Sequence, residues 1–311
     1  IIGDEAHIPY QRPPLSKAYL KGEQSADKVY LRAESFYADR NITMKLSTTA
    51  TAIDTVAKTV ALNTDEALSY DHLLISTGSR PRKLSIEGSG LPGIHYLRTM
   101  DDVDGLREGM RPDANLVIVG GGYIGLEVAA VGRELGLNVH VLEMEERILQ
   151  RVTTPEMSAY YHQLHEGRGV HIHTGTGVTG FAGDGKVEEV ICGDQRFAAD
   201  IVIVGIGIIA NTELAEAAGI HCDNGIVVDE HCRTSDPFVY AAGDCTNHPN
   251  PLLDRRLRLE SVPNAMDQAR VSTANMLGDE KTYAAIPWFW SDQYELKLQM
   301  VGFSADGDTQ V

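Results

Sequence analysis

Runs of apolar residues alternate with glycine-rich turns along the chain, and the clearest example lies near its centre. Residues 116–119 form an unbroken apolar run, which is typical of a buried parallel strand. From 126 to 135 the apolar residues follow helical spacing. A second strand-like run, 138–142, leads directly to the acid Glu143. The pattern predicts a strand–helix–strand unit that ends in a carboxylate.

Three glycines separate the first strand from the helix in the spacing G-x-G-x-x-G: Gly120, Gly122 and Gly125. In such a unit the first glycine permits a tight turn, the second lets the backbone approach a pyrophosphate, and the third allows the helix to pack closely on the strand. The helix N-terminus offers free N–H groups to the phosphates. We therefore predict an NAD(H) site in this unit. Its expected residues are Gly120, Gly122, Tyr123, Ile124, Gly125, Glu143, Arg151 and Gly207.

The acid that closes this unit bears on the choice of cofactor. Glu143 follows the first glycine by 23 residues, a spacing that suits hydrogen bonds to an adenosine ribose. A 2′-phosphate would meet like charge there, which favours NADH over NADPH. Arg147 and Arg151 follow closely and weaken that preference.

Further strand ends fit a layout with two dinucleotide sites. The segments 70–78, 200–207 and 238–244 are apolar runs that end in glycine or Gly-Asp, and ligands bind at such carboxyl ends in open α/β sheets. Residues 1–5, Ile-Ile-Gly-Asp-Glu, resemble the end of another second strand with its acid. A matching glycine turn would lie about 20–25 residues upstream and is not in the sequence. We expect a fragment that lacks the first strand, glycine loop and helix of that unit.

Composition and charge restrict the partners. The 311 residues carry 44 acidic and 27 basic side chains, a formal net charge of −17, which disfavours nucleic acid and anionic membranes. No apolar run approaches the roughly 20 residues of a membrane-spanning helix. The four cysteines form no Cys-x-x-Cys pair and fit a reducing cytosol, so a cytoplasmic protein is expected. The eleven histidines show no metal-ligand spacing, and no metal is expected.

Five motifs occur together and in order, and their combination resembles one family. They are 9–17 (PYQRPPLSK), 120–127 (GGGYIGLE), 234–245 (TSDPFVYAAGDC), 260–265 (ESVPNA) and 287–293 (PWFWSDQ). The set is similar to the FAD-dependent, NADH-using ferredoxin reductases of bacterial oxygenase systems. The resemblance covers essentially the whole chain. It implies the glutathione-reductase fold: two Rossmann-like dinucleotide-binding domains and an α+β C-terminal interface domain, which we expect to be truncated.

The resemblance also implies domain limits and FAD contacts. Residues 1–99 and 224–286 would form the FAD domain, 100–223 the NAD domain and 287–311 the start of the interface domain. The residues that would contact FAD are Asp4 (with Glu5 as the fallback), Arg12, Lys17, Ala50, Thr77, Gly78, Asp244, Val262 and Trp290.

Three residues would serve the hydride transfer itself. By resemblance, Lys17 lies beside the reactive edge of the flavin, Glu127 pairs with it, and Tyr123 gates the nicotinamide pocket. A lysine beside the ring favours the negative charge of a reduced flavin. A buried lysine in turn needs a partner of opposite charge.

The implied reaction passes electrons from NADH through FAD to a [2Fe–2S] ferredoxin that serves an oxygenase. An acidic ferredoxin would need a basic island on this acidic chain, for which the candidates are Arg255, Arg256, Arg258, Arg270 and Lys297. Two alternatives stay open within the fold, a rubredoxin reductase and an NADH oxidase. A third is a degenerate NAD-binding remnant without FAD.

Overall fold

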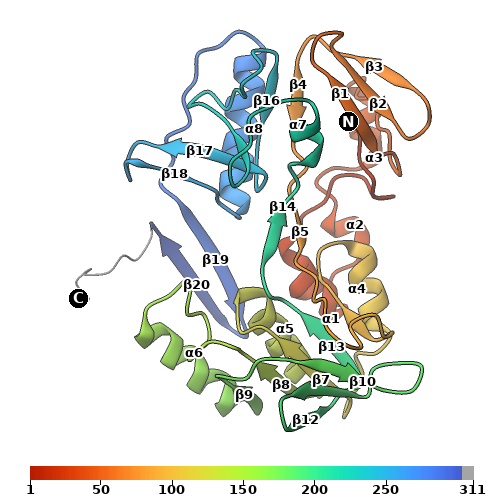
Figure 1. Cartoon of the computed structure of the whole chain (residues 1–311), viewed down its shortest axis with the longest axis vertical. Coiled ribbons are helices and arrows are strands. Elements are labelled where there is room, and N and C mark those ends of the chain that lie inside the picture. Colours follow the sequence, from red (N-terminus) through yellow and green to blue (C-terminus); the bar gives the residue numbers. More distant parts are fainter. Residues whose placement is uncertain (303–311) are drawn as a thin grey trace.

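The computed structural model describes residues 1–302, which form two α/β lobes stacked along the long axis of the molecule (Figure 1). The lower lobe contains the predicted strand–helix–strand unit, with β7 at Asn115–Val119, α5 at Tyr123–Glu134 and β8 at Asn138–Leu142. That prediction is confirmed. The helix begins three residues earlier than its apolar spacing indicates, because Gly125, which interrupts that spacing, lies inside its first turn.

Five parallel strands make the sheet of the lower lobe, in the order β6-β13-β7-β8-β9. The three further strands are β6 (Ile94–His95), β9 (Val170–His173) and β13 (Ile201–Val204). The lobe's other helices are α4 (Met100–Arg107) and α6 (Pro155–Gly167). A small antiparallel sheet consists of β10 (Gly180–Ala182), β11 (Glu189–Cys192) and β12 (Gln195–Ala198).

Alternation along β7 explains how both faces of this sheet are covered. Leu116 and Ile118 lie in one core with residues of α5, whereas Val117 and Val119 pack with Phe181 in a second core under β10–β12. Residues 116–119 of β7 are all buried, as the unbroken apolar run predicts.

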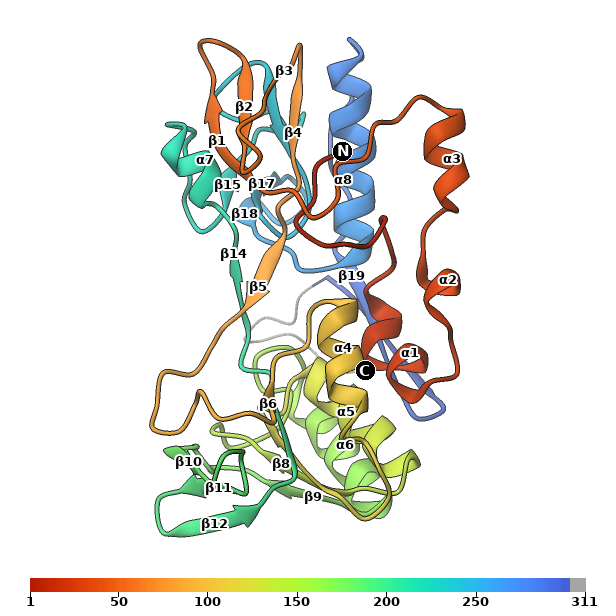
Figure 2. The ribbon, with the colours of Figure 1, turned by 90° about the vertical axis from the view of Figure 1, so that its right-hand side faces the viewer.

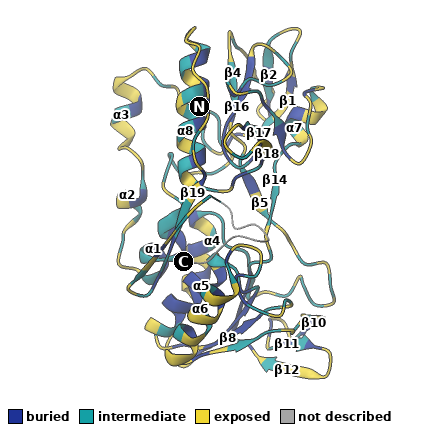
Figure 3. Cartoon of the chain, turned by 90° about the vertical axis from the view of Figure 1, so that its left-hand side faces the viewer, coloured by how far each residue is buried: buried dark blue, intermediate teal, exposed yellow. Residues whose placement is uncertain are grey.

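The upper lobe is built from short strands around a separate core. Its elements are α3 (Glu34–Asp39), β1 (Ala50–Asp54), β2 (Thr59–Leu62), β3 (Ala67–Ser69), β4 (Leu73–Ile75), α7 (Glu213–Ala217), β15 (Ile226–Val227), β16 (Val239–Ala241), β17 (Thr246–Asn250), β18 (Arg255–Leu257) and α8 (Val262–Met276). The short helix α2 (Ala26–Val29) packs instead on the core of the lower lobe, to which Val29 belongs. β4 and β16 pair in parallel, so that the segments after them, 76–78 and 242–244, end at the same edge. Figure 3 shows that α3 is largely exposed whereas the lower sheet is buried.

Two extended strands run between the lobes as an antiparallel ribbon, β5 (Ser79–Pro81) and β14 (Ile208–Ala210) (Figure 2). β6 joins the lower sheet, and α7 shares a core with β1. We therefore propose that the chain crosses between the two domains at this ribbon, so that both crossings come earlier in the sequence than the expected limits of 99 and 223.

The remaining elements flank the junction of the lobes. A 3-10 turn, η1 (Pro13–Ser16), and α1 (Ala18–Lys21) pack beside α5. The hairpin of β19 (Trp288–Gln293) and β20 (Leu296–Val301) runs along the lower lobe, and Leu298 belongs to that lobe's core. The hairpin thus brings the C-terminal motif to the helix that follows the glycine loop.

A buried histidine in the upper lobe predicts a pH-dependent stability. His248 is fully buried with no hydrogen-bond partner, and burial, reinforced by Arg256, lowers its pKa from 6.5 to about 4. Between these values the unfolded chain binds more protons than the folded one, so the free energy of unfolding falls as the pH drops from about 6.5 to 4. At about 1.4 kcal/mol per pKa unit, the loss is on the order of 3 kcal/mol. Urea unfolding at pH 7 and 4.5 measures this loss of unfolding free energy. His248→Phe, which cannot be protonated, should lose less stability between the two pH values. Equal losses in the two proteins would contradict the assignment of the effect to His248.

Candidate functional site: two dinucleotide sites at the junction of the lobes

The glycine loop has the geometry that a pyrophosphate-binding turn requires. Gly120 has φ +108°, and a Cβ there would lie 2.4 Å from the carbonyl oxygen of Gly205. A Cβ on Gly125 would lie 2.3 Å from the carbonyl oxygen of Gly120. Gly122 caps α5 in an extended conformation, and a Cβ there would have no atom within 4 Å. Two glycines are therefore required by the protein's own packing, whereas the space at Gly122 is open for a ligand.

The acid after β8 is held against the glycine loop. The amide N–H of Gly121 donates to Oε2 of Glu143 over 2.7 Å, and that of Glu145 donates to Oε1 over 2.8 Å. The remaining lone pairs of the half-buried carboxylate are free to accept ribose hydroxyls.

The two arginines that could favour a 2′-phosphate are already engaged. Arg147 donates to backbone oxygens and to Ser158, and Arg151 lies 3.3 Å from Glu145 at the surface. The geometry therefore adds to the preference for NADH. Gly207 lies directly before β14, with φ +102° and open space around it, and Ile124 is half-exposed at the start of α5.

A buried ion pair lies one helical turn beyond the loop. Nζ of Lys17 lies 2.6 Å from Oε2 of Glu127, and Ser16 donates to the same oxygen over 2.5 Å. Glu127 is only 3% exposed, so its charge depends on these partners. The structure thus contains the pairing that the resemblance implies.

Tyr123 joins the glycine loop to the C-terminal hairpin. Its ring meets Phe289 edge-to-face at 4.8 Å, and its hydroxyl lies 3.1 Å from the sulfur of Met300. Burial raises the pKa of Tyr123 well above 10, so the ring stays neutral at ordinary pH. Its expected role as the gate of the nicotinamide pocket remains a prediction.

A cavity of about 940 Å³ opens between the lobes beside the β5–β14 ribbon. Four of the nine expected FAD contacts line it: Asp4, Arg12, Thr77 and Gly78. Asp244 borders it through Ser79 and Arg98, which are lining residues. Lys17, Ala50, Val262 and Trp290 lie outside its lining, and their FAD contacts remain predictions.

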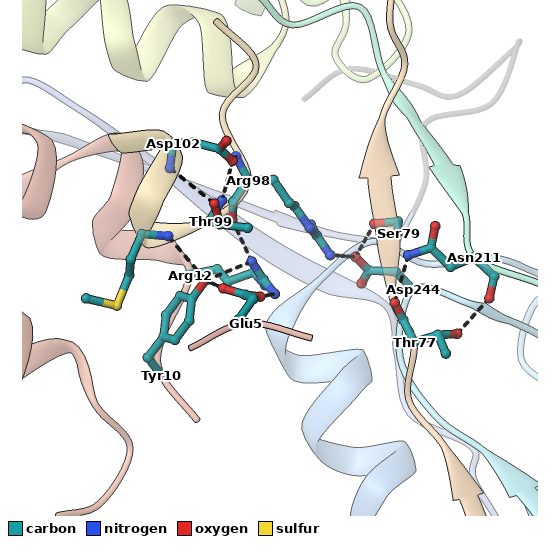
Figure 4. A network of polar contacts seen from close by, with 11 residues as sticks. Glu5, Tyr10, Arg12, Thr77, Ser79, Arg98, Thr99, Asp102, Asn211 and Asp244 are labelled. Carbon is teal, nitrogen blue, oxygen red and sulfur yellow. Dashed lines mark hydrogen bonds and ion pairs between the residues drawn. The ribbon is translucent and has the colours of Figure 1, made fainter. Parts of the chain in front are cut away.

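Figure 4 shows the polar network along this cavity. Arg98 reaches Asp244 over 3.2 Å, while Arg12 pairs with Glu5 over 2.7 Å and donates to the backbone oxygen of Arg98. Burial, with the nearby Arg12, lowers the pKa of the Arg98 guanidinium, so an anionic ligand would be favoured there. The two guanidinium groups and the open backbone at 76–78 fit the pyrophosphate of FAD. The carboxylate of Asp244 fits the hydroxyl groups of the ribityl chain. Tyr10, whose hydroxyl donates to Glu5, completes the network.

Sequence reasoning missed Arg98 and Tyr10 in this site. Arg98 follows no glycine motif, and it meets Asp244 across 146 positions of the chain. Tyr10 lies inside the motif 9–17, in which the resemblance implies roles only for Arg12 and Lys17. Glu5, expected only as an alternative to Asp4, is instead engaged by Arg12 and Tyr10.

Comparison with known proteins decides the family. The model of the pyridine nucleotide-disulphide oxidoreductases matches residues 1–269, and that of the reductase C-terminal domain matches 288–311. The chain belongs to the pyridine nucleotide-disulphide oxidoreductases. This confirms the expected fold class and the expected cofactors, FAD and NAD(H).

Named relatives of this oxidoreductase match nearly its whole length. It is 48% identical over 316 residues to putidaredoxin reductase of Pseudomonas putida, covering 99% of this chain and 75% of the relative. It is 45% identical over 313 residues to rhodocoxin reductase of Rhodococcus erythropolis, covering 100% and 73%. The crystal structure of the covalent putidaredoxin reductase–putidaredoxin complex matches with a TM-score of 0.96 at 47% identity, covering 99% of this chain and 76% of the matched one.

Other chemistries find no support among the described residues. All four cysteines are free within residues 1–302, and burial raises the pKa of Cys232 to about 12 and that of Cys222 to about 11. No cluster of three or more His, Cys, Asp or Glu that could hold a metal occurs in this part of the chain. Over the same residues no helix is long and apolar enough to cross a membrane.

Proposed function

We propose that this oxidoreductase takes electrons from NADH through FAD and delivers them to a [2Fe–2S] ferredoxin that serves an oxygenase. The observation that carries the proposal is the near full-length likeness to putidaredoxin reductase, in sequence and in the structure of its complex with putidaredoxin. The NADH preference follows from Glu143 and from the engaged Arg147.

The protein's own residues bind and orient the reactants. When bound, FAD accepts a hydride from NADH and releases the two electrons one at a time. Gly120, Gly122 and Gly125 hold the pyrophosphate of NADH, and Glu143 holds its ribose. Tyr123 covers the nicotinamide.

The charged pair and the tryptophan serve the flavin. Lys17, charged and paired with Glu127, favours negative charge at the ring. Trp290, on the strand beside this pair, shields the ring on the side where the acceptor arrives.

The electrons leave to an external acceptor because no dithiol lies in the path. The cysteines nearest to the cofactor cavity in sequence are Cys222 and Cys245, which are unpaired. Cys245 is fully buried directly before β17, and burial raises its pKa. Neither thiol is suited to form a disulfide with a substrate. The four free thiols also support a cytoplasmic location.

An acidic acceptor would dock on a basic island of this acidic chain. Of the five candidates, Arg258 and Arg270 are already paired with Glu260 and Asp267. Arg256 is also engaged, because it donates to the backbone oxygens of Val228 and Asn247. On their exposure we propose Arg255 and Lys297 as docking cations.

A panel of acceptors tests the proposal. The flavin-loaded protein is mixed with NADH and either a [2Fe–2S] ferredoxin, a rubredoxin or oxygen alone, and the rates are compared. Ferredoxin should be reduced fastest, and its rate should fall as salt rises from 50 to about 500 mM because docking is electrostatic. Faster reduction of rubredoxin would assign the alternative acceptor, and a rate equal to that with oxygen alone would indicate an NADH oxidase.

A further inference from the structure

β19 presents a repeating set of side chains to the helix that carries the ion pair. Phe289 meets Tyr123, and two residues later the hydroxyl of Ser291 donates to Oε1 of Glu127 over 2.7 Å. Tyr123 and Glu127 are four positions apart on α5, so they lie on one helix face. Ser291 is fully buried, and it is the third donor to the carboxylate, after Lys17 and Ser16.

The contact continues inward through two more buried groups. Nε2 of Gln293 lies 3.1 Å from Oγ of Ser291, and Oε1 of Gln293 lies 2.8 Å from Nε2 of His165 on α6. Nδ1 of His165 lies 3.4 Å from the hydroxyl of Tyr294. Gln293 and His165 are both 0% exposed, so every polar atom here needs a partner within the protein.

The chemistry of these groups fixes which atom donates and which accepts along this chain of hydrogen bonds. An ionised Glu127 only accepts, so Ser291 must donate to it and in turn accept from the amide N–H of Gln293. The amide oxygen then accepts from His165, which requires a proton on Nε2; in a neutral ring this leaves Nδ1 unprotonated. Tyr294 donates to that free Nδ1. Burial lowers the pKa of His165, which agrees with a neutral ring.

This hydrogen-bond chain is suited to holding the Glu127 carboxylate in one orientation, and not to moving a proton. The amide of Gln293 stands between His165 and Ser291, and an amide does not exchange protons readily enough to relay them. Its effect on Glu127 is therefore to fix where the carboxylate points.

The opposite side of β19 carries the tryptophans. Trp288 and Trp290 alternate with Phe289 and Ser291, and their rings are 5.5 Å apart. One strand thus holds Glu127 with one side and presents Trp290 with the other.

We propose that Ser291, held by Gln293 and His165, is a positioning residue for the Lys17–Glu127 pair. Through it the β19–β20 hairpin sets the position of Lys17 relative to the flavin. The consequence for hydride transfer rests on the proposed function, whereas the hydrogen-bond chain itself does not.

The first test measures the protonation of His165 in the hydrogen-bond chain and does not depend on enzyme activity. Nitrogen-15 NMR of the histidine rings in the flavin-loaded protein should show His165 as a neutral ring protonated at Nε2 from pH 6 to 8. Gln293→Leu should remove that tautomer preference, while the matched Gln299→Leu, an exposed residue on β20, should leave it unchanged. A ring protonated at Nδ1, or doubly protonated at pH 7, would overturn the proposed direction.

The second test measures the effect on the ion pair. Anaerobic reduction of the flavin by NADH in a single turnover should slow about tenfold in Ser291→Ala, the typical effect of losing one hydrogen bond to a charged group. Ser291→Thr, which keeps the hydroxyl, should recover the rate to within about twofold. The dissociation constant for NADH should stay the same, because Ser291 does not line the glycine loop.

The outcomes separate this proposal from a structural role and from the proposed function. A lower melting temperature with an unchanged reduction rate in Ser291→Ala, or no recovery in Ser291→Thr, would overturn the positioning role. If NADH failed to reduce the flavin even in the unmodified protein, the proposed function would fail, while the tautomer of His165 would still report on the chain.

Discussion

Gly122→Ala should fold as the unmodified protein does and bind NADH about 10–100-fold more weakly. The backbone at Gly122 is extended, with φ −82° and ψ −178°, which any residue adopts. An added Cβ would meet no protein atom within 4 Å, and the change at the helix cap costs under about 1 kcal/mol. The methyl group would instead occupy the place where the backbone approaches the pyrophosphate. Fluorescence titration with NADH and a thermal melt measure the two quantities separately.

Two glycine controls make this result specific. Gly125→Ala would place a Cβ 2.3 Å from a backbone oxygen and should lower the melting temperature as well as the affinity. Gly90→Ala lies in open space on the surface and should change neither. NADH affinity in Gly122→Ala equal to that of the unmodified protein would show that the pyrophosphate lies elsewhere.

Lys17→Met should lower the free energy of unfolding by about 3 kcal/mol and slow reduction of the flavin by NADH. Glu127 is 3% exposed, and without Lys17 its carboxylate keeps only the hydroxyls of Ser16 and Ser291. Removing one member of a buried pair leaves a charge with no ionic partner, which typically costs 3–5 kcal/mol; the two hydroxyls place the expected value near the low end. Urea unfolding and anaerobic stopped-flow measure the two effects.

The double variant Lys17→Met/Glu127→Gln distinguishes stability from catalysis. Without the unpaired charge it should regain most of the lost stability, yet reduction of the flavin should stay slow because no cation lies beside the ring. A double variant that reduced its flavin at the unmodified rate would remove Lys17 from the proposed mechanism. A double variant as unstable as Lys17→Met would show that packing, and not charge, accounts for the loss.

Local geometry explains which parts of the NAD site were predictable from the sequence. The turn at Gly120, the close approach of Gly125 to the Gly120 carbonyl and the contact of Glu143 with the loop all arise within one strand–helix–strand unit, so spacing alone locates them. The approach of Gly120 to Gly205 lies outside that unit and was not predictable from it. The start of α5 at Tyr123 was less predictable, because a helix cap of glycine leaves no apolar signal.

Contacts between distant segments explain what the sequence did not reveal. Ser291 meets Glu127 across 164 positions, and Arg98 meets Asp244 across 146. No periodicity connects such residues, and serine and arginine are ordinary surface residues by type. The pairing of Lys17 with Glu127, 110 positions apart, was foreseen only through the family resemblance.

Contacts within the fold also limit how far the sequence alone can select the docking cations. The density of arginines at 255–258 marks a basic segment, but burial and contacts within the fold decide how far each guanidinium reaches the surface. Arg258 is only 18% exposed and paired with Glu260, whereas Arg256 is exposed and donates to the backbone oxygens of Val228 and Asn247. The sequence does not reveal this difference between two neighbouring arginines.

The stoichiometry of electron transfer tests the central claim most directly. The flavin-loaded protein is given a known amount of NADH under anaerobic conditions together with an excess of oxidised [2Fe–2S] ferredoxin, and both chromophores are followed in the visible spectrum. The account predicts that NADH bleaches the flavin band and that two ferredoxins are reduced for each NADH consumed, because a hydride carries two electrons and each cluster accepts one. A protein that binds NADH but shows no flavin bleaching, or a bleached flavin that leaves the ferredoxin oxidised, would contradict it.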